Sequence, residues 1–212
     1  MHFKKTIFKN GLRLITAPMK DTSTVTVIVA VAAGSKYETK KLNGLSHFLE
    51  HMFFKGTKKR PKTKDIAEAL DAVGGEFNAY TSQESTAYYA KVDKEHIKLA
   101  IDVVSDIFLN SKIDANEIEK ERGVILQEIN MYEDNPMMSV GEEFENLLYG
   151  DQPAGWKVIG TKENIAAMSR KDFVDYREKF YNAKNTVVCV VGNFAQPASL
   201  RPPATIAFRA GK

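Results

Sequence analysis

The order of hydrophobic and polar positions predicts a succession of short strands and amphipathic helices. Residues 4–8, 12–17 and 24–33 are rich in β-branched and apolar side chains, which favours strands. Asn10 and Gly11 separate the first two of these segments, and an Asn-Gly pair is a strong hairpin signal. The chain therefore opens with a predicted hairpin followed by a central strand.

Helical periodicity and a few further strands account for most of the remaining sequence. More strands are predicted at residues 76–81, 85–92 and 186–191. Helices are predicted at residues 44–54, 63–73, 96–109, 114–132, 139–149 and 171–180. Strand pairs followed by helices and a returning strand predict an α+β fold, with a mixed, largely antiparallel sheet covered by helices.

Several residues mark where the predicted helices begin and end. Asp114, with Glu117 three positions later, is expected to form a capping box at one helix start. Ser169 is expected to cap another helix. Pro136 is expected to lie between two helices, because proline is poorly tolerated inside a helix.

The composition is that of an ordinary globular protein with a sizeable core. The 212 residues are 43% hydrophobic and 27% charged, and this length suits one large or two small domains. The net charge of +3 is too small to indicate a nucleic-acid-binding protein. We interpret the basic run at residues 55–64 as a solvated loop rather than a binding patch.

Cysteine use and hydropathy favour a cytoplasmic protein that does not associate with membranes. Cys189 is the only cysteine, so an intrachain disulfide is impossible, which fits a reducing compartment. It lies in the apolar run 187–191, which indicates a buried, unreactive thiol. The first residues lack the apolar run of a secretory signal, and no segment approaches the roughly 20 apolar residues of a membrane span.

The most informative segment is His-Phe-Leu-Glu-His at residues 47–51. His47 and His51 are four positions apart, so they project from one face of the predicted helix and can bind one divalent metal ion. Glu50 points to nearly the same side, where it can take a proton from a water whose pKa zinc lowers to about 7. Taken alone, the segment fits equally well a helix with two surface histidines.

A catalytic zinc site needs a third protein ligand. Glu121 and Glu128 lie seven positions, or two helical turns, apart on the helix predicted at 114–132. One carboxylate could bind the metal while the other supports it through a hydrogen bond. Two solvated glutamates on a surface helix are the alternative, which the spacing alone does not exclude.

Together these motifs resemble the pitrilysin and mitochondrial-processing-peptidase family, zinc peptidases with the inverted motif HxxEH. The family's spacing between second histidine and glutamate ligand is matched here, since 76 residues lie between His51 and Glu128. Further matching segments are Asn10-Gly11-Leu12, Gly34-Ser35-Lys36-Tyr37-Glu38 and Gly74-Gly75-Glu76-Phe77-Asn78-Ala79-Tyr80-Thr81. The resemblance covers about residues 3–194 and is strongest to the bacterial processing-protease branch.

The resemblance implies a role for each residue of the site. His47, His51 and Glu128 would bind zinc. Glu50 would be the general base that deprotonates water and then the acid that protonates the leaving amine. Glu121 would orient His51 through a hydrogen bond.

The implied substrate is a peptide or an unfolded protein. In the family, the strand that contains Asn78, Ala79 and Tyr80 is a sheet edge to which the substrate is added as a further strand. The expected function is therefore that of a zinc-dependent endopeptidase domain that hydrolyses peptides or presequences.

Family members usually contain two homologous domains, and this chain corresponds to the first. Residues 1–194 are expected to form the zinc-binding catalytic half-domain, and residues 195–212 a disordered or foreign tail. The chain is expected to pair with itself or with a second homologous chain. It is either a truncated form or a natural half beside a partner. The alternative function is a half that binds zinc and peptide but is inactive or weakly active alone.

Overall fold

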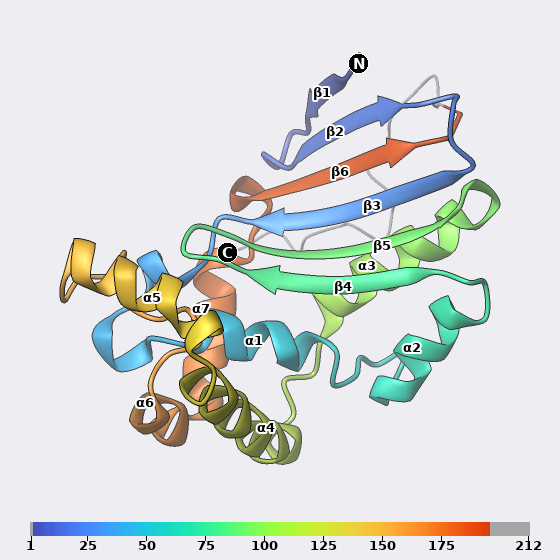
Figure 1. Ribbon diagram of the computed structural model, residues 1–212. Helices are drawn as coiled ribbons and strands as arrows, with labels where there is room; N and C mark the ends of the chain where they lie inside the picture. The colour runs from blue at the N-terminus through green and yellow to red at the C-terminus, as the bar shows by residue number, and fades with distance from the viewer. Residues whose placement is uncertain (1, 196–212) are drawn as a thin grey trace.

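A six-stranded sheet forms the centre of the molecule (Figure 1). The computed structural model describes residues 2–195. Its strands are β1 (Lys4–Ile7), β2 (Arg13–Pro18), β3 (Thr24–Val31), β4 (Glu76–Thr81), β5 (Thr86–Asp93) and β6 (Thr186–Gly192), in the order β1-β2-β6-β3-β5-β4. Among these strands, β2 and β6 run parallel and every other neighbouring pair is antiparallel. The prediction of a mixed, largely antiparallel sheet is therefore confirmed.

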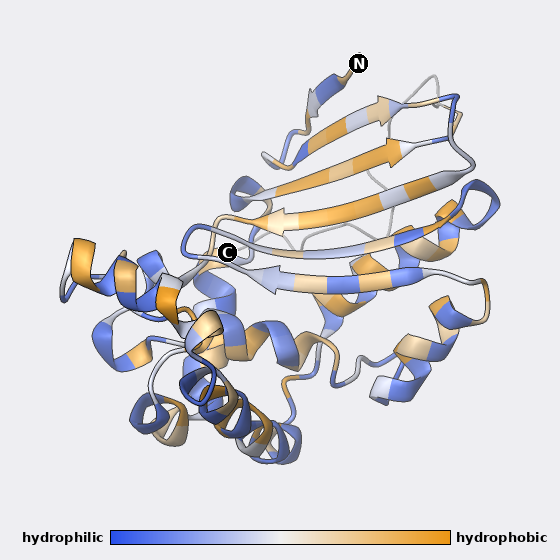
Figure 2. Cartoon of the chain, viewed as in Figure 1, coloured by the Kyte–Doolittle hydropathy of each residue, from blue (hydrophilic) through white to orange (hydrophobic). Residues whose placement is uncertain are grey.

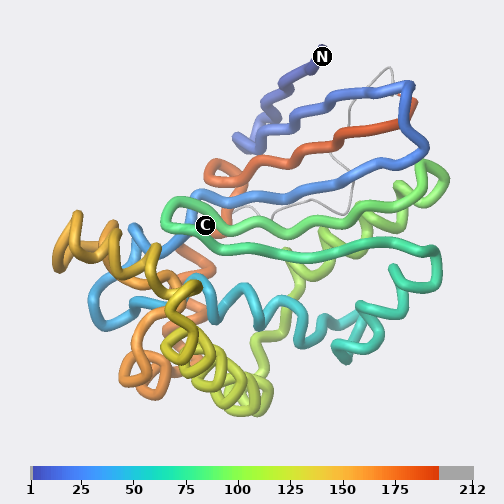
Figure 3. The backbone as a smooth tube through the Cα atoms, in the orientation of Figure 1, coloured from blue at the N-terminus to red at the C-terminus, as the bar shows by residue number. Residues whose placement is uncertain are grey.

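The helices lie against one face and one edge of this sheet. They are α1 (Leu45–Phe53), α2 (Thr63–Asp71), α3 (Ile97–Asn110), α4 (Ala115–Glu133), α5 (Pro136–Tyr149), α6 (Lys162–Ala167) and α7 (Arg170–Phe180). The helix α3 packs against β3 and β5, whereas α1 contacts β4, β5, α4 and α7. Figure 3 shows β6, from the end of the described chain, between β2 and β3 from its beginning. Through its contacts with β4 and α4, α1 lies between the β4 edge of the sheet and α4.

Alternate residues of the central strands form the hydrophobic core. In β3, Val25, Val27 and Val29 are at most 1% exposed, and the residues between them are partly exposed. Their neighbours across the sheet on β5 and β6 are also buried. Figure 2 shows this concentration of hydrophobic residues in β2, β6 and β3. Burial of each valine side chain stabilises the fold by roughly 1.5–3 kcal/mol.

Two helices differ from the sequence-based expectations. The helix α5 begins at Pro136, earlier than predicted, because proline fits the first turn of a helix, where its missing N–H costs nothing. The side chain of Asn135 caps it by accepting the backbone N–H of Met137 at 3.1 Å. The short helix α6 has no counterpart among the predicted helices, because its six residues cannot show a clear helical period.

Both predicted helix caps, Asp114 and Ser169, are present, but the capping box expected at Asp114 is not. Asp114 accepts the backbone N–H groups of Asn116 and Glu117 at 2.9 and 3.3 Å and so caps α4. The expected capping box does not form there, and the Glu117 carboxylate accepts a hydrogen bond from Lys120 at 2.6 Å. At α7, Ser169 does form a capping box.

Other predictions concern the cysteine, the membrane and the tail. Cys189 lies on β6 and is partly buried, and this burial raises the pKa of its thiol. Within residues 2–195, no helix is long and apolar enough to cross a membrane. The predicted tail at 195–212 lies, apart from residue 195, outside the described residues.

Candidate metal centre

The segment 47–51 lies on α1, and the two sides of this helix have different surroundings. Its apolar residues, among them Phe48 and Leu49, are fully buried in the core. His47, Glu50 and His51 are only partly buried and line a cleft of about 390 Å³. The motif therefore faces this cleft, while the apolar side of the same helix anchors it to the sheet.

A buried carboxylate holds the N-terminus of α1. The N-cap residue is Gly44, which has no side chain to accept a hydrogen bond. Glu38 supplies the acceptor: its carboxylate accepts the backbone N–H of Gly44 at 2.8 Å and that of Ser46 at 2.6 Å. Burial raises the pKa of Glu38, and these hydrogen bonds oppose that rise. Glu38 belongs to the segment 34–38 that carried part of the resemblance, and here its role is to position the motif-bearing helix.

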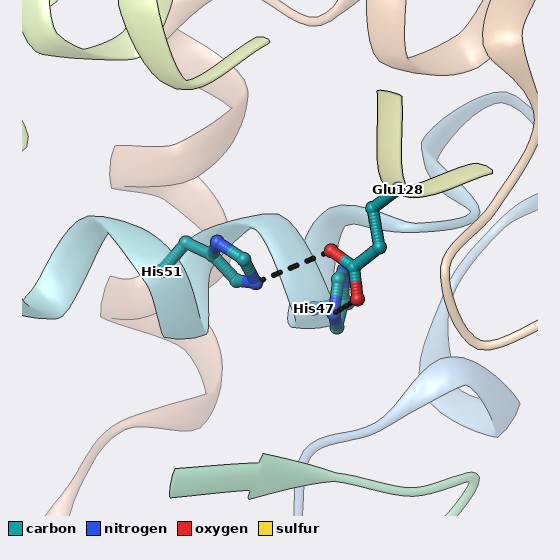
Figure 4. Close-up of side chains that lie close together, drawn as sticks. All are labelled: His47, His51 and Glu128. Atoms are coloured by element: carbon teal, nitrogen blue, oxygen red, sulfur yellow. Dashed lines mark ion pairs between the residues drawn. The ribbon is translucent and has the colours of Figure 1, made fainter. Parts of the chain in front are cut away.

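His47, His51 and Glu128 lie close together, as Figure 4 shows, and all three line the cleft. The Nε2 atom of His47 lies 3.8 Å from Oε1 of Glu128, and Nε2 of His51 lies 3.7 Å from Oε2 of the same carboxylate. The two imidazole rings come from α1 with centroids 4.7 Å apart, and Glu128 comes from α4. The three predicted metal ligands are thus brought together across two helices.

The second predicted glutamate, Glu121, lies on the other side of His51. Its Oε1 atom is 2.9 Å from Nδ1 of His51, and its Oε2 atom is 2.5 Å from Nζ of Lys55. A carboxylate partner at Nδ1 holds the imidazole proton on that nitrogen and leaves the lone pair of Nε2 directed at Glu128. Burial raises the pKa of Glu121, but its bonds to His51 and Lys55 outweigh burial and lower it overall.

The charge states of the site suit metal binding. Burial, reinforced by the neighbouring His51, lowers the pKa of His47 to about 3, so this imidazole is neutral and free to bind a cation. Burial also raises the pKa of the Glu128 carboxyl, with a further rise from Glu121 and an opposing effect of His51. In such surroundings a nearby divalent cation stabilises the charged form of the carboxylate.

The donor set fits zinc in both chemistry and spacing. Two imidazoles and one carboxylate are a known ligand set of catalytic zinc sites. The ligand atoms of His47, His51 and Glu128 lie within 4.8 Å of one another. Tetrahedral ligands at about 2.1 Å from zinc are about 3.4 Å apart. The distances of 3.7 and 3.8 Å involve different oxygens of Glu128, and one ligand atom from each residue lies within 4.8 Å of the others. The ligand atoms therefore have to approach one another by up to about 1.4 Å to hold the ion.

Glu50 lies in the same cleft and has a partner that the sequence analysis did not assign to the site. The hydroxyl of Thr81, at the end of β4, donates a hydrogen bond to Oε2 of Glu50. Burial raises the pKa of Glu50, whereas the bond from Thr81 lowers it, His51 lowers it further and Glu128 raises it. Thr81 is part of the quoted segment 74–81, so a signal was present, but its contact with α1 follows only from the packing.

The predicted substrate strand is the edge of the sheet. Within the described sheet β4 pairs with β5 alone, and its other side has no strand partner. Ala79 and Tyr80 line the cleft beside the histidines, whereas Asn78 lies on the same strand outside the lining and is exposed. Further lining residues that the sequence did not single out are Tyr132, Glu142, Val158 and Ile159.

Comparison with known proteins decides the family. Residues 13–162 match the sequence profile of the family described as Insulinase (Peptidase family M16). The chain belongs to peptidase family M16. This M16 chain is 40% identical over 192 residues to a protein of Bacillus subtilis named as an uncharacterized zinc protease, with 91% of this chain and 47% of that protein covered. The name agrees with the expectation of zinc.

Solved structures of M16 proteins have the same fold. A protease from Helicobacter pylori superposes with a TM-score of 0.86 at 27% sequence identity, with 92% of the M16 chain and 47% of that protein covered. An M16 inactive domain from Pseudomonas fluorescens shares the fold with a TM-score of 0.83, at 16% identity. The M16 chain spans about half the length of these relatives.

Proposed function

We propose that this chain is the zinc-binding half of a peptidase that hydrolyses peptides or presequences. The observation that carries the proposal is the convergence of His47, His51 and Glu128 in one cleft with Glu50. A zinc ion held by these ligands supplies a Lewis acid that makes water acidic enough to give up a proton near neutral pH. The single cysteine supports a reducing, cytoplasmic location.

Glu50 is the general base of this proposal. Its carboxylate lies beside the ligands, and the Thr81 hydroxyl fixes one of its oxygens. The other oxygen can accept a proton from water and later deliver it to the leaving amine. Burial raises the pKa of Glu50, which makes it a stronger base than a solvated carboxylate.

The substrate binds along β4. This strand is an edge of the described sheet, and its residues Ala79 and Tyr80 line the cleft next to the proposed ligands. An extended peptide can pair with the free backbone groups of such an edge. Because those bonds involve only the main chain, this mode of binding accepts many sequences and favours unfolded substrates over folded ones.

A second candidate follows from the length of the chain. It spans about half of the relatives that it matches, so groups that stabilise the transition state can belong to another half. On this alternative the chain binds zinc and peptide but turns over slowly by itself. The two candidates share the metal site and differ in the rate that the isolated chain supports.

Metal analysis and a peptide assay test the proposal together. The purified chain should contain, or take up, about one zinc per molecule, since a single site of three ligands is present among the described residues. Glu50→Gln should keep the zinc and lower the hydrolysis of a quenched peptide by about 10²-fold or more, because the amide cannot accept the proton.

Glu95→Gln is the matched control, because Glu95 is an exposed carboxylate between β5 and α3, outside the cleft lining and away from β4. It should leave both zinc content and rate unchanged. A parent chain that neither contains nor takes up zinc contradicts the proposal. Equal rates for the parent and Glu50→Gln contradict the role of Glu50, and a zinc-loaded but inactive parent supports the second candidate.

A further inference from the structure

Lys55 is joined to the candidate metal centre through Glu121. Its Nζ atom lies 2.5 Å from Oε2 of Glu121, whose other oxygen lies 2.9 Å from Nδ1 of His51. The side chains of Glu121 and Lys55 are only 6% and 22% exposed. The basic run at residues 55–64 is predicted from the sequence to be a solvated loop. This prediction is wrong at Lys55, whose ammonium group is turned toward a buried carboxylate, and at Arg60, which is buried.

The backbone on both sides of Lys55 is fixed. The N–H of Lys55 donates to the carbonyl of Met52 in the last turn of α1 at 3.2 Å. Gly56 has a φ of +114°, and a Cβ at this position would lie 2.3 Å from the carbonyl oxygen of Pro61, so the turn requires glycine. The carbonyl of Gly56 in turn accepts the N–H of Lys112 at 3.1 Å.

The residues that follow are anchored to α3. The hydroxyl of Thr57 donates to Asp106 at 2.7 Å, and the guanidinium of Arg60 donates to the same carboxylate at 2.8 Å. These three side chains are buried. The loop after α1 is therefore anchored on both sides of Lys55, and the Lys55 side chain extends from it to Glu121 on α4.

The two partners of Glu121 together define the orientation of its carboxylate. With one oxygen on His51 and the other on Lys55, rotation of the group breaks at least one charge-assisted bond. Without the ammonium group, Oε2 would be left as a buried anionic oxygen lacking this partner, which is costly. The carboxylate would then turn toward solvent and release Nδ1 of His51.

We propose that Lys55 is a positioning residue of the metal centre, which holds Glu121 and through it the imidazole of His51 in the orientation that binds zinc. Lys55 touches neither the proposed ligand atoms nor the substrate cleft, since it lies outside the lining of that cleft. Its effect is therefore on zinc affinity. This inference rests on the proposed zinc site.

The test compares zinc affinities by competition with a chromophoric chelator, using the full chain without substrate. Lys55→Met removes the ammonium group and keeps the apolar stem, and it should weaken zinc binding by about 10-fold or more, as loss of a group that orients a ligand does. Lys55→Arg keeps a cation and should stay closer to the parent. Lys112→Met is the control, because Lys112 lines the same surface cleft as Lys55 and its removal changes the net charge equally.

A double-mutant cycle with Glu121→Gln separates positioning from a general loss of charge or stability. In the Glu121→Gln background, Lys55→Met should have little further effect, because the path to His51 is already broken. Circular dichroism checks the fold, and Lys55→Gln replaces Lys55→Met if the latter is unfolded.

Equal zinc affinity of the parent and Lys55→Met overturns the inference while leaving the zinc site intact. Equal losses in Lys55→Met and Lys112→Met, or additive losses with Glu121→Gln, also overturn it, because either result shows a charge effect without a path through Glu121. A parent chain that binds no zinc is a different failure, since it removes the proposed function itself.

Discussion

At the scale of single residues, the three carboxylates around the histidines differ in their partners. Glu128 faces the Nε2 atoms of both imidazoles. Glu121 is hydrogen-bonded to Nδ1 of His51, and Glu50 accepts a hydrogen bond from Thr81. These different partners support the different roles proposed for the three carboxylates: metal ligand for Glu128, orienting group for Glu121 and general base for Glu50.

The different positions of Glu121 and Glu128 predict different costs of substitution. Glu128→Gln removes a proposed ligand and should weaken zinc binding more than Glu121→Gln does. Loss of an orienting carboxylate typically costs about 10- to 100-fold in metal affinity or activity. Chelator competition measures the zinc affinity of both variants. A greater loss of affinity for Glu121→Gln than for Glu128→Gln would mean that the two roles are exchanged.

At the scale of elements, the site depends on the placement of α1 between the β4 edge and α4. One side of the helix is buried in the core, and its N-terminus is held by Glu38 through the backbone N–H groups of Gly44 and Ser46. The C-terminal side leads into the anchored loop that carries Lys55. Both ends of the helix are thus fixed, which keeps the two imidazoles at a constant position relative to Glu128.

Removal of the Glu38 carboxylate should destabilise the fold and the site together. Glu38→Ala leaves buried N–H groups without their acceptor, and we expect the free energy of unfolding to fall by about 2–3 kcal/mol. Urea denaturation of the zinc-free chain measures it. Glu68→Ala is the control, because Glu68 is exposed and pairs with Lys64 on the surface of α2, so its loss should cost less than about 1 kcal/mol. Similar values for both variants would contradict the role of Glu38.

At the scale of the whole molecule, α5 stands out because it has no buried residue. Its exposed apolar side chains are Met137, Met138, Val140, Phe144, Leu147, Leu148 and Tyr149. Figure 2 shows hydrophobic residues on this helix although it lies at the edge of the molecule. Exposed apolar patches of this kind are typical of surfaces that meet another protein.

This surface predicts that the isolated chain self-associates. Light scattering should show a dimer or larger species at working concentrations, because association removes the apolar side of α5 from water. Replacing both Phe144 and Leu147, which are 62% and 82% exposed, by serine should shift the chain to a monomer with an unchanged circular dichroism spectrum. A parent chain that is monomeric at high concentration would contradict the prediction.

Much of the candidate site could be predicted because its members are local in sequence or share one helix. His47, Glu50 and His51 share one face of α1 through the period of the helix, and Glu121 and Glu128 share one face of α4 in the same way. The resemblance paired these two helices, and the structure brings them together. The roles of these residues as ligands, base and orienting group stay predictions.

The sequence by itself determined the type and approximate limits of most elements, because hydrophobic periodicity and capping residues act over a few positions. Only the tertiary structure decided that β6 lies between β2 and β3, that Thr81 donates to Glu50, and that Lys55 reaches Glu121. These contacts join residues far apart in the chain. They depend on how whole elements pack against one another, which no local pattern of polar and apolar residues encodes.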